Sequence, residues 1–215
     1  MMTFKKYSSI ENTYDKDFLE RVRLYCPPEQ EFVVQEKVHG SNICLVTDGS
    51  SVHFGKRSGF VEVDEKFFDY EELLDRYHSK VVLLFSMVKK EFPDLVSLTL
   101  FGEMFGGRYP HPDVKNNFKT INIQKGVFYC PYHEFYAFDM YVALSDSSRF
   151  LSVDEANAFF ELGGFFYAKT LMRGSLSVCL EYPNNGLSQI GLWLGLPPLE
   201  GNICEGVVIR PVVPT

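Results

Sequence analysis

A lysine follows an apolar run near the amino terminus, within residues 36–42 (EKVHGSN). The apolar residues 32–34 and 43–46 on either side are typical of strands, and residues 40–42 supply turn residues between them. A lysine at the end of a buried strand is costly to desolvate, so it is usually placed elsewhere. A partly buried ammonium group can lose its proton near neutral pH and become a nucleophile. The segment therefore predicts that Lys37 is a nucleophile.

Two acidic residues lie within apolar runs further along the chain. Glu103 lies between glycines in residues 101–106 (FGEMFG), and Glu205 opens residues 205–210 (EGVVIR). A buried carboxylate needs a partner, which is either a structural cation or a hydroxyl group of a ligand. Glycines beside it let a backbone or a ligand approach closely. Both runs therefore predict acidic groups at a binding site.

Other residues can be interpreted only in context. Arg57 follows Lys56 at the end of a short apolar run, and its planar guanidinium suits phosphate. A solvated hairpin end is the commoner explanation for such a pair. Phe138, in residues 135–139 (FYAFD), is by default a core residue.

In their order along the chain these segments resemble the motifs of covalent nucleotidyltransferases. Residues 37–42 resemble motif I, residues 55–57 motif Ia, residues 101–106 motif III, residues 135–139 motif IIIa and residues 205–210 motif IV. Each match is weak alone, but five in order make coincidence a poor explanation. They most resemble the T4 RNA ligase 2 type, which includes the trypanosome RNA-editing ligases. DNA ligases and mRNA capping enzymes usually carry Asp in place of His39, and residues 4–9 (FKKYSS) also resemble the phage-type amino terminus.

The resemblance implies an ATP-dependent RNA ligase that joins 3′-hydroxyl and 5′-phosphate RNA ends through lysyl-AMP and RNA-adenylate intermediates. Lys37 and Glu205 would be catalytic, and ATP and Mg²⁺ or Mn²⁺ would be the cofactors, with Glu205 and Asp139 as metal ligands. Phe138 would stack on the adenine ring. The residues that would bind the nucleotide are Glu36, Val38, Asn42, Arg57, Glu103, Phe138 and Arg210.

Residues 104–130 are rich in positive charge. They contain Arg108, Lys115, Lys119 and Lys125 but only one acid, Asp113. A solvated loop would explain this charge, but clustered basic residues also contact phosphates. With the resemblance, the segment is a candidate surface for RNA ends, and we expect nicked duplex RNA as the partner. The predicted RNA-binding residues are His39, Lys56, Arg108, His111, Lys115 and Lys119.

Composition limits the class of protein. The chain has 215 residues, 46% of them hydrophobic, and a net charge of −7, which argues against indiscriminate polyanion binding without excluding a local basic groove. Its five cysteines form no Cys-x-x-Cys pair, so we expect free thiols in a reducing compartment and no zinc site. No apolar run approaches the length of a membrane span, and no signal or transit peptide is seen. We expect a cytoplasmic protein, or a mitochondrial one if it is an editing ligase.

Apolar periodicity and turn residues predict the helices and strands. We expect an α+β fold with antiparallel sheets and flanking helices, and the resemblance implies a nucleotide cleft between the sheets. A hairpin turn at residues 48–49 would bring Lys37 and Arg57 together. Residues 165–168 suggest a further strand, and residues 174–180 fit either a helix or a strand. Helices are expected over residues 15–24, 69–91 and 152–163, and strands over residues 32–35, 42–47, 52–55, 97–101, 135–142 and 205–210.

The sequence departs from the family pattern at its end. Motif V, a Lys-x-Lys strand that would contact the ATP phosphates, does not occur before Thr215, and neither does the carboxy-terminal helical domain. We therefore expect residues 1–215 to form one adenylyltransferase domain, truncated before motif V. Two alternatives remain: a catalytically impaired RNA-end-binding module, and another nucleotidyltransferase, either a DNA ligase or an mRNA capping enzyme.

Overall fold

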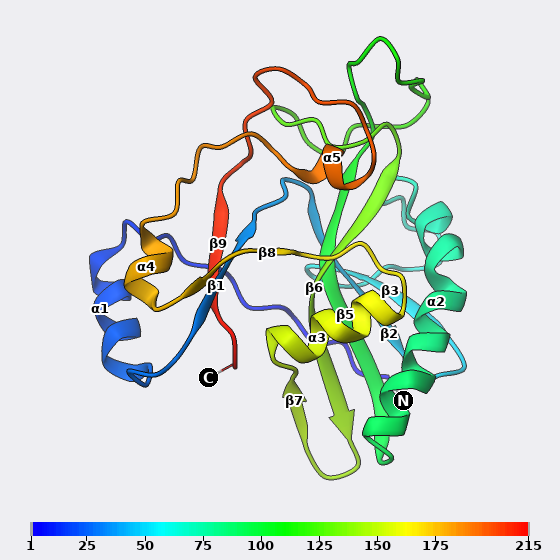
Figure 1. Ribbon diagram of the computed structural model, residues 1–215. Helices are drawn as coiled ribbons and strands as arrows, with labels where there is room; N and C mark the ends of the chain where they lie inside the picture. The colour runs from blue at the N-terminus through cyan, green and yellow to red at the C-terminus, as the bar shows by residue number, and fades with distance from the viewer. Residues whose placement is uncertain (1, 215) are drawn as a thin grey trace.

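The computed structural model describes residues 2–214, which form two antiparallel β-sheets with helices packed against them (Figure 1). The strands are β1 (Phe32–Glu36), β2 (Ser41–Thr47), β3 (Val52–Lys56), β4 (Gly59–Phe60), β5 (Leu95–Gly106), β6 (His133–Leu144), β7 (Ser148–Phe150), β8 (Thr170–Gly174) and β9 (Val207–Pro211). The helices are α1 (Lys16–Tyr25), α2 (Tyr70–Glu91), α3 (Val153–Leu162), α4 (Leu176–Leu180) and α5 (Ile190–Trp193). One sheet has the order β4-β3-β2-β5-β6-β7 and the other the order β8-β1-β9. The α+β class with antiparallel sheets is confirmed.

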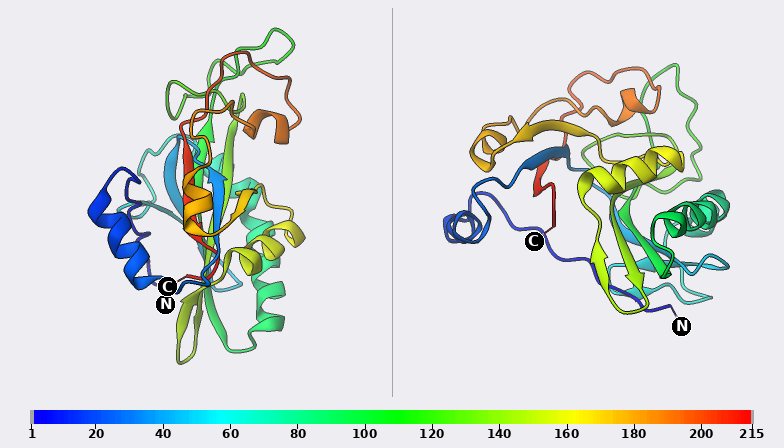
Figure 2. Two further views of the ribbon diagram at one scale, coloured as in Figure 1. Left: turned by 60° about the vertical axis from the view of Figure 1, so that its left-hand side comes forward. Right: turned by 60° about the horizontal axis from the view of Figure 1, so that its bottom comes forward.

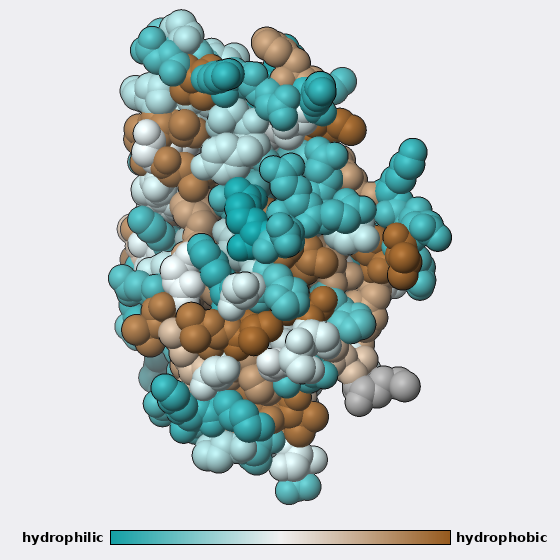
Figure 3. Space-filling view, turned by 90° about the vertical axis from the view of Figure 1, so that its right-hand side faces the viewer, coloured by the Kyte–Doolittle hydropathy of each residue, from teal (hydrophilic) through white to brown (hydrophobic). Residues whose placement is uncertain are grey.

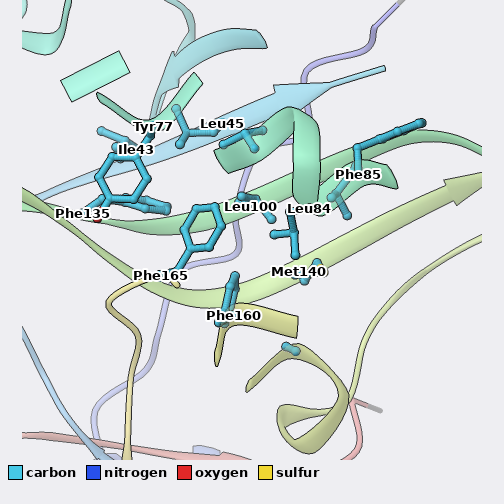
Figure 4. Packing of buried hydrophobic residues seen from close by; sticks show 14 of the residues in the cluster. Ile43, Leu45, Tyr77, Leu84, Phe85, Leu100, Phe135, Met140, Phe160 and Phe165 are labelled. Carbon is cyan, nitrogen blue, oxygen red and sulfur yellow. The ribbon is translucent and has the colours of Figure 1, made fainter. Parts of the chain in front are cut away.

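The main core lies between α2, α3 and one face of the six-stranded sheet (Figure 4). The apolar residues of α2 recur at intervals of three and four, which places Leu73, Tyr77, Val81, Leu84 and Val88 on one buried face. Each fully buried side chain of this size contributes about 1.5–3 kcal/mol. The opposite face of α2 presents mostly hydrophilic side chains (Figure 3). The prediction of this helix is confirmed.

A capping box begins α3, as its sequence predicts. The Ser152 hydroxyl accepts a hydrogen bond from the Glu155 backbone N–H (3.2 Å), and the Glu155 carboxylate accepts one from the Ser152 N–H (2.7 Å). The helix ends at Gly163 and packs on β6 and α2. It therefore covers the core beside α2.

The three-stranded sheet has its own helices, which lie away from the six-stranded sheet (Figure 2). Phe32 and Val34 of β1 face Val22 of α1 and Cys179 of α4. The alternate residue, Val33, points to the other side and packs on Val153. Both faces of β1 are therefore buried, one by α1 and α4 and the other by the part of the chain that includes Val153.

The amino-terminal segment, residues 2–14, forms neither helix nor strand, in keeping with the expected extended start. It crosses the face of the six-stranded sheet that α2 does not cover. Phe4 and Tyr7 pack there on a cluster that includes Val46, Phe101 and Phe150. The segment thus serves as the cover of this sheet face.

Several boundaries differ from those expected from the sequence. The strand expected over residues 97–101 continues to Gly106, because β5 pairs with β6 along its whole length. Residues 165–168 form no strand and make only the single bridge of Tyr167 to Ala137, and the strand lies later, at β8. The ambiguous residues 174–180 form the helix α4. Tertiary pairing decides strand ends more strongly than local composition.

Two expectations drawn from composition can be compared with the structure. All five cysteines are free thiols, and three of them are buried. None of the helices described in residues 2–214 combines the length and apolarity that a bilayer crossing needs.

Candidate active site

A cavity of about 510 Å³ opens between the two sheets, a volume within the usual range of small-molecule sites. The β1–β2 crossing, β5, β6, β9 and the amino-terminal segment supply its walls. The sequence-predicted residues that line it are Glu36, Lys37, Val38, Asn42, Arg57, Glu103, Phe138 and Arg210. Side chains far apart in the sequence therefore share one cavity.

Lys37 lies where the chain crosses from one sheet to the other. The two strands around it do not pair with each other, since β1 belongs to the three-stranded sheet and β2 to the six-stranded sheet. The expected hairpin at residues 48–49 joins β2 to β3, and Lys37 and Arg57 line the same cavity, but Lys37 lies on the crossing between the sheets and outside that hairpin. The Lys37 backbone N–H donates to the carbonyl of Gly206 (3.0 Å), which extends the β1–β9 pairing to the nucleophile candidate.

Gly40 lets the crossing segment lie against β5. A Cβ atom there would be 2.2 Å from the carbonyl oxygen of Met104 and 2.8 Å from the Cγ atom of Glu103. The first of these atoms is backbone and cannot move aside. Only glycine permits this approach, which brings the crossing segment beside Glu103.

Glu205 pairs with Lys37 directly. Its carboxylate accepts a hydrogen bond from the Lys37 ammonium group, and about a third of the lysine side chain remains exposed. Glu205 precedes β9 and is not inside it, contrary to the strand expected over residues 205–210. It remains accessible to solvent beside the cavity, so its second oxygen can reach a further partner.

The carboxyl group of Glu103 has a pKa well above its ordinary value. Burial raises its pKa to about 7, and the nearby Glu205 carboxylate acts in the same direction. Hydrogen bonds from the Gly40 N–H and the Asn42 side chain, and the charge of Lys37, offset part of this shift. Glu103 can therefore either donate or accept a hydrogen bond near neutral pH.

Asp139 does not lie in the cavity lining, and its partners are protein groups. Its carboxylate accepts hydrogen bonds from Arg210 (2.8 Å), from the Tyr7 hydroxyl (2.9 Å) and from the Met140 backbone N–H (3.1 Å). Burial raises its pKa, and the Arg210 charge opposes that shift. Both oxygens of Asp139, a predicted metal ligand, therefore have protein partners in this structure. Asp139 positions Arg210, which also donates to the carbonyl of Phe138 (2.8 Å).

The sequence did not identify the amino-terminal segment as part of the site. Tyr7, Ser8 and Ile10 line the cavity, and the Tyr7 ring packs edge-on against Phe138 with centroids 5.0 Å apart. Arg57 donates to the Ser9 hydroxyl (2.9 Å). The sequence offered one signal for this segment, the resemblance of residues 4–9 to the phage-type amino terminus, but that resemblance assigned no function to any of these residues.

Glu36 lines the cavity, but both of its oxygens have protein partners. The Ser188 hydroxyl donates to one oxygen (2.6 Å) and the Gln189 backbone N–H donates to the other (2.8 Å). Burial raises its pKa, and these two donors limit the rise. Ser188 was also missed from the sequence, because it is 152 residues away along the chain.

The predicted RNA-binding residues lie outside the cavity lining and do not form one group. Lys56 pairs with Glu65, and the His39 backbone N–H donates to the Tyr129 hydroxyl (2.8 Å). The other four lie on the loop of residues 107–132, which joins β5 to β6 at the top of Figure 1. They are Arg108, His111, Lys115 and Lys119, of which all but the half-buried His111 are exposed.

Comparison with known proteins supports a relationship at the level of sequence. The sequence model of the RNA ligase family matches residues 30–215. RNA-editing ligase 1, mitochondrial, of Trypanosoma brucei brucei is 36% identical over 211 residues, which cover 85% of this chain and 45% of that protein. RNA-editing ligase 2, mitochondrial, of the same organism is 28% identical over 230 residues, covering 96% and 55%. The chain thus spans about half the length of the curated relatives it matches.

Solved structures share the fold. An apo structure of a mutant Naegleria gruberi RNA ligase R4a aligns with a TM-score of 0.62 at 15% identity, over 99% of this chain and 55% of that one. An archaeal ATP-dependent RNA ligase aligns with a TM-score of 0.53 at 20% identity, over 99% and 46%. At these identities the likeness concerns the fold alone, while the family match covers most of the sequence. The chain belongs to the RNA ligase family.

Proposed function

We propose that this chain carries the nucleotidyltransferase domain of an ATP-dependent RNA ligase. The observation that carries the proposal is the shared cavity, in which Lys37, Glu103, Phe138 and Arg210 meet although they come from four separate parts of the chain. The names of the trypanosome relatives and the family match support the same activity. We propose residues 1–215 as one such domain.

Lys37 is the proposed nucleophile. Its Nζ atom, after losing a proton, attacks the α-phosphorus of ATP, so that a nitrogen–phosphorus bond forms and pyrophosphate leaves. The AMP group then passes to a 5′-phosphate RNA end, and the adjacent 3′-hydroxyl displaces AMP. The Glu205 carboxylate, already bonded to the amine, can hold it in place and accept its proton.

The cavity walls suggest how the nucleotide would lie. Phe138 offers a half-buried ring for stacking on the base, and Glu103 offers a carboxyl group for the ribose hydroxyls. Arg210 and Arg57 can meet the phosphates through their guanidinium donors. Asn42 and Val38 lie beside them in the wall. Glu36 would lie at the edge of the adenine, with its carboxylate held by residues 188 and 189.

A divalent cation at this site would need oxygen ligands from the ATP phosphates in addition to those of the protein. No group of three or more His, Cys, Asp or Glu residues is placed to hold a metal within the part of the chain that is described. Mg²⁺ commonly uses one or two carboxylates together with substrate phosphates, and Glu205 is the accessible carboxylate beside Lys37. When bound, such a cation would offset the charge that develops on the phosphates. Structures of the Naegleria gruberi ligase are described with ATP and Mn.

The RNA partner is proposed from charge. Loop 107–132 carries four basic residues and one acidic residue, whereas the whole chain has a net charge of −7. Nicked duplex RNA is the proposed substrate. The proposed compartment is the cytoplasm, or the mitochondrion if the RNA is an editing substrate, and cell fractionation would distinguish them.

The test is covalent labelling. The protein, incubated with α-labelled ATP and Mg²⁺, is expected to retain label after denaturation, and Lys37→Ala is expected to abolish it. Lys66→Ala is the matched control, because Lys66 makes no ion pair and does not line the cavity. Label on Lys37→Ala would refute the nucleophile, and a wild type that binds RNA but never labels would favour a non-catalytic RNA-end-binding module. Labelling by GTP, or sealing of nicked DNA alone, would point to a capping enzyme or a DNA ligase.

A further inference from the structure

The inference concerns an exposed aromatic residue on loop 107–132, outside the cavity. Phe118 is 85% exposed, whereas every other phenylalanine in residues 2–214 is buried or half-buried. A phenyl ring exposed to this degree contributes nothing to the core. Long loops without secondary structure in a compact domain are commonly functional.

Positive charge surrounds this ring in the sequence. Lys119 follows it directly, Lys115 lies three residues before it, and both side chains are exposed. Ile121, which is 58% exposed, adds apolar surface nearby. An apolar ring between basic side chains matches a nucleic-acid strand, because the bases present flat faces and the backbone presents phosphates.

The loop is organised by its own hydrogen bonds, so the ring projects from an ordered support. The Asn116 side chain accepts from the Tyr109 N–H (2.7 Å) and donates to the Tyr109 carbonyl (2.8 Å). The Thr120 N–H donates to the Asn117 carbonyl (3.0 Å). Tyr109 is buried and bonds to the carbonyl of Pro197, which ties the loop to the neighbouring segment at the same end of the molecule (Figure 1). A preorganised support lowers the entropy cost of binding.

The same loop touches the segment that bears Lys37. The Tyr129 hydroxyl accepts from the His39 N–H (2.8 Å), and the Gln124 side chain donates to the Gly40 carbonyl (3.1 Å). The loop that bears Phe118 is therefore anchored to the segment that bears Lys37.

We propose that Phe118 stacks on an unpaired or terminal base of the RNA, with Lys115 and Lys119 holding the adjoining phosphates. The proposal rests on the proposed function for the identity of the ligand as RNA. It adds a residue that selects RNA with an accessible base at the joining site. A protein partner would use the same ring as an apolar contact, so the two cases differ in whether an aromatic face is needed.

The test compares three substitutions at position 118 in binding to a nicked duplex RNA that carries 2-aminopurine at the nick. Stacking is worth about 1–3 kcal/mol per base, so Phe118→Ala should raise Kd by a factor of about 5 to 150. Phe118→Leu should show a similar loss, while Phe118→Trp should retain binding and the quenching of the fluorescent base. Tyr25→Ala, which removes an aromatic residue that is 78% exposed on α1, should change nothing.

Full binding by Phe118→Leu would overturn the stacking role, as would unchanged binding by Phe118→Ala. If either result is found, and a protein that binds the wild type does not bind Phe118→Ala, the ring would be assigned to a protein partner. Binding is measured without ATP, so it is independent of lysyl-AMP formation. If the wild-type protein binds RNA but is never labelled by ATP, and Phe118→Ala weakens that binding, the ligase proposal is refuted and the stacking proposal stands.

Discussion

The guanidinium of Arg210 lies 2.8 Å from the carboxylate of Asp139, and only 14% and 5% of the two side chains are exposed. Breaking such a buried pair leaves an uncompensated charge. Asp139→Ala is therefore expected to lower the free energy of unfolding by about 3–5 kcal/mol, measured by urea denaturation at pH 7. The exposed pair of Arg173 with Glu31 is the control, and Glu31→Ala should cost less than about 1 kcal/mol. Equal losses in the two variants would contradict the importance of burial.

Glu103 makes stability depend on pH. Its pKa is about 7 in the folded protein and 4.5 in its ordinary state, so the folded protein binds the proton more tightly. The stabilisation from this group is complete below about pH 4.5, is lost as pH rises towards 7, and changes no further above that. Glu103→Gln should therefore gain stability relative to the wild type between pH 5 and pH 8. If the difference between the urea midpoints of the two proteins does not change with pH, burial does not raise the pKa of Glu103 in the folded protein.

Gly40 is expected to tolerate no side chain. In Gly40→Ala the new Cβ would meet the Met104 carbonyl oxygen at 2.2 Å, so the crossing segment must move. Overpacking of this kind costs about 1–3 kcal/mol, and a displacement of about 1 Å at a reacting group can slow a reaction about 100-fold. Gly40→Ala should therefore lower the free energy of unfolding and slow the transfer of label from ATP to the protein. Gly59→Ala is the control, since a Cβ there meets nothing within 4 Å; similar behaviour of the two variants would refute the steric argument.

Ser188 supports Glu36 from a distant part of the chain. Ser188→Ala removes the hydroxyl that donates at 2.6 Å to a buried carboxylate. The pKa of Glu36, which burial already raises, should rise further, and stability at pH 7 should fall by about 1.5–3 kcal/mol. Ser58→Ala, at an exposed serine, should stay within about 0.5 kcal/mol. Equal urea midpoints for the two variants would show that the Gln189 N–H alone is sufficient.

The sequence predicted eight of the eighteen residues that line the cavity, and several of these are out of place by local rules. Lys37, Glu103 and Arg210 are charged groups beside apolar runs, and their order along the chain matched a family. The α2 helix was predictable for a similar reason, since its apolar period is unbroken. Features with a strong local signal were therefore placed close to their correct positions.

The remaining features depend on contacts that no local pattern contains. Two strands joined by a turn look the same whether they pair with each other or separate into two sheets, as β1 and β2 do. Tyr7 reaches Asp139 across 132 residues, so neither residue signals the other. The same holds for Asp139 and Arg210, which are 71 residues apart and pair directly.

The position of Lys37 between the sheets has a mechanical consequence. The residue is covalently continuous with β1 on one side and, through residues 38–40, with β2 on the other. Its position is therefore fixed by both sheets at once, so any change in their separation would alter where the amine lies in the cavity.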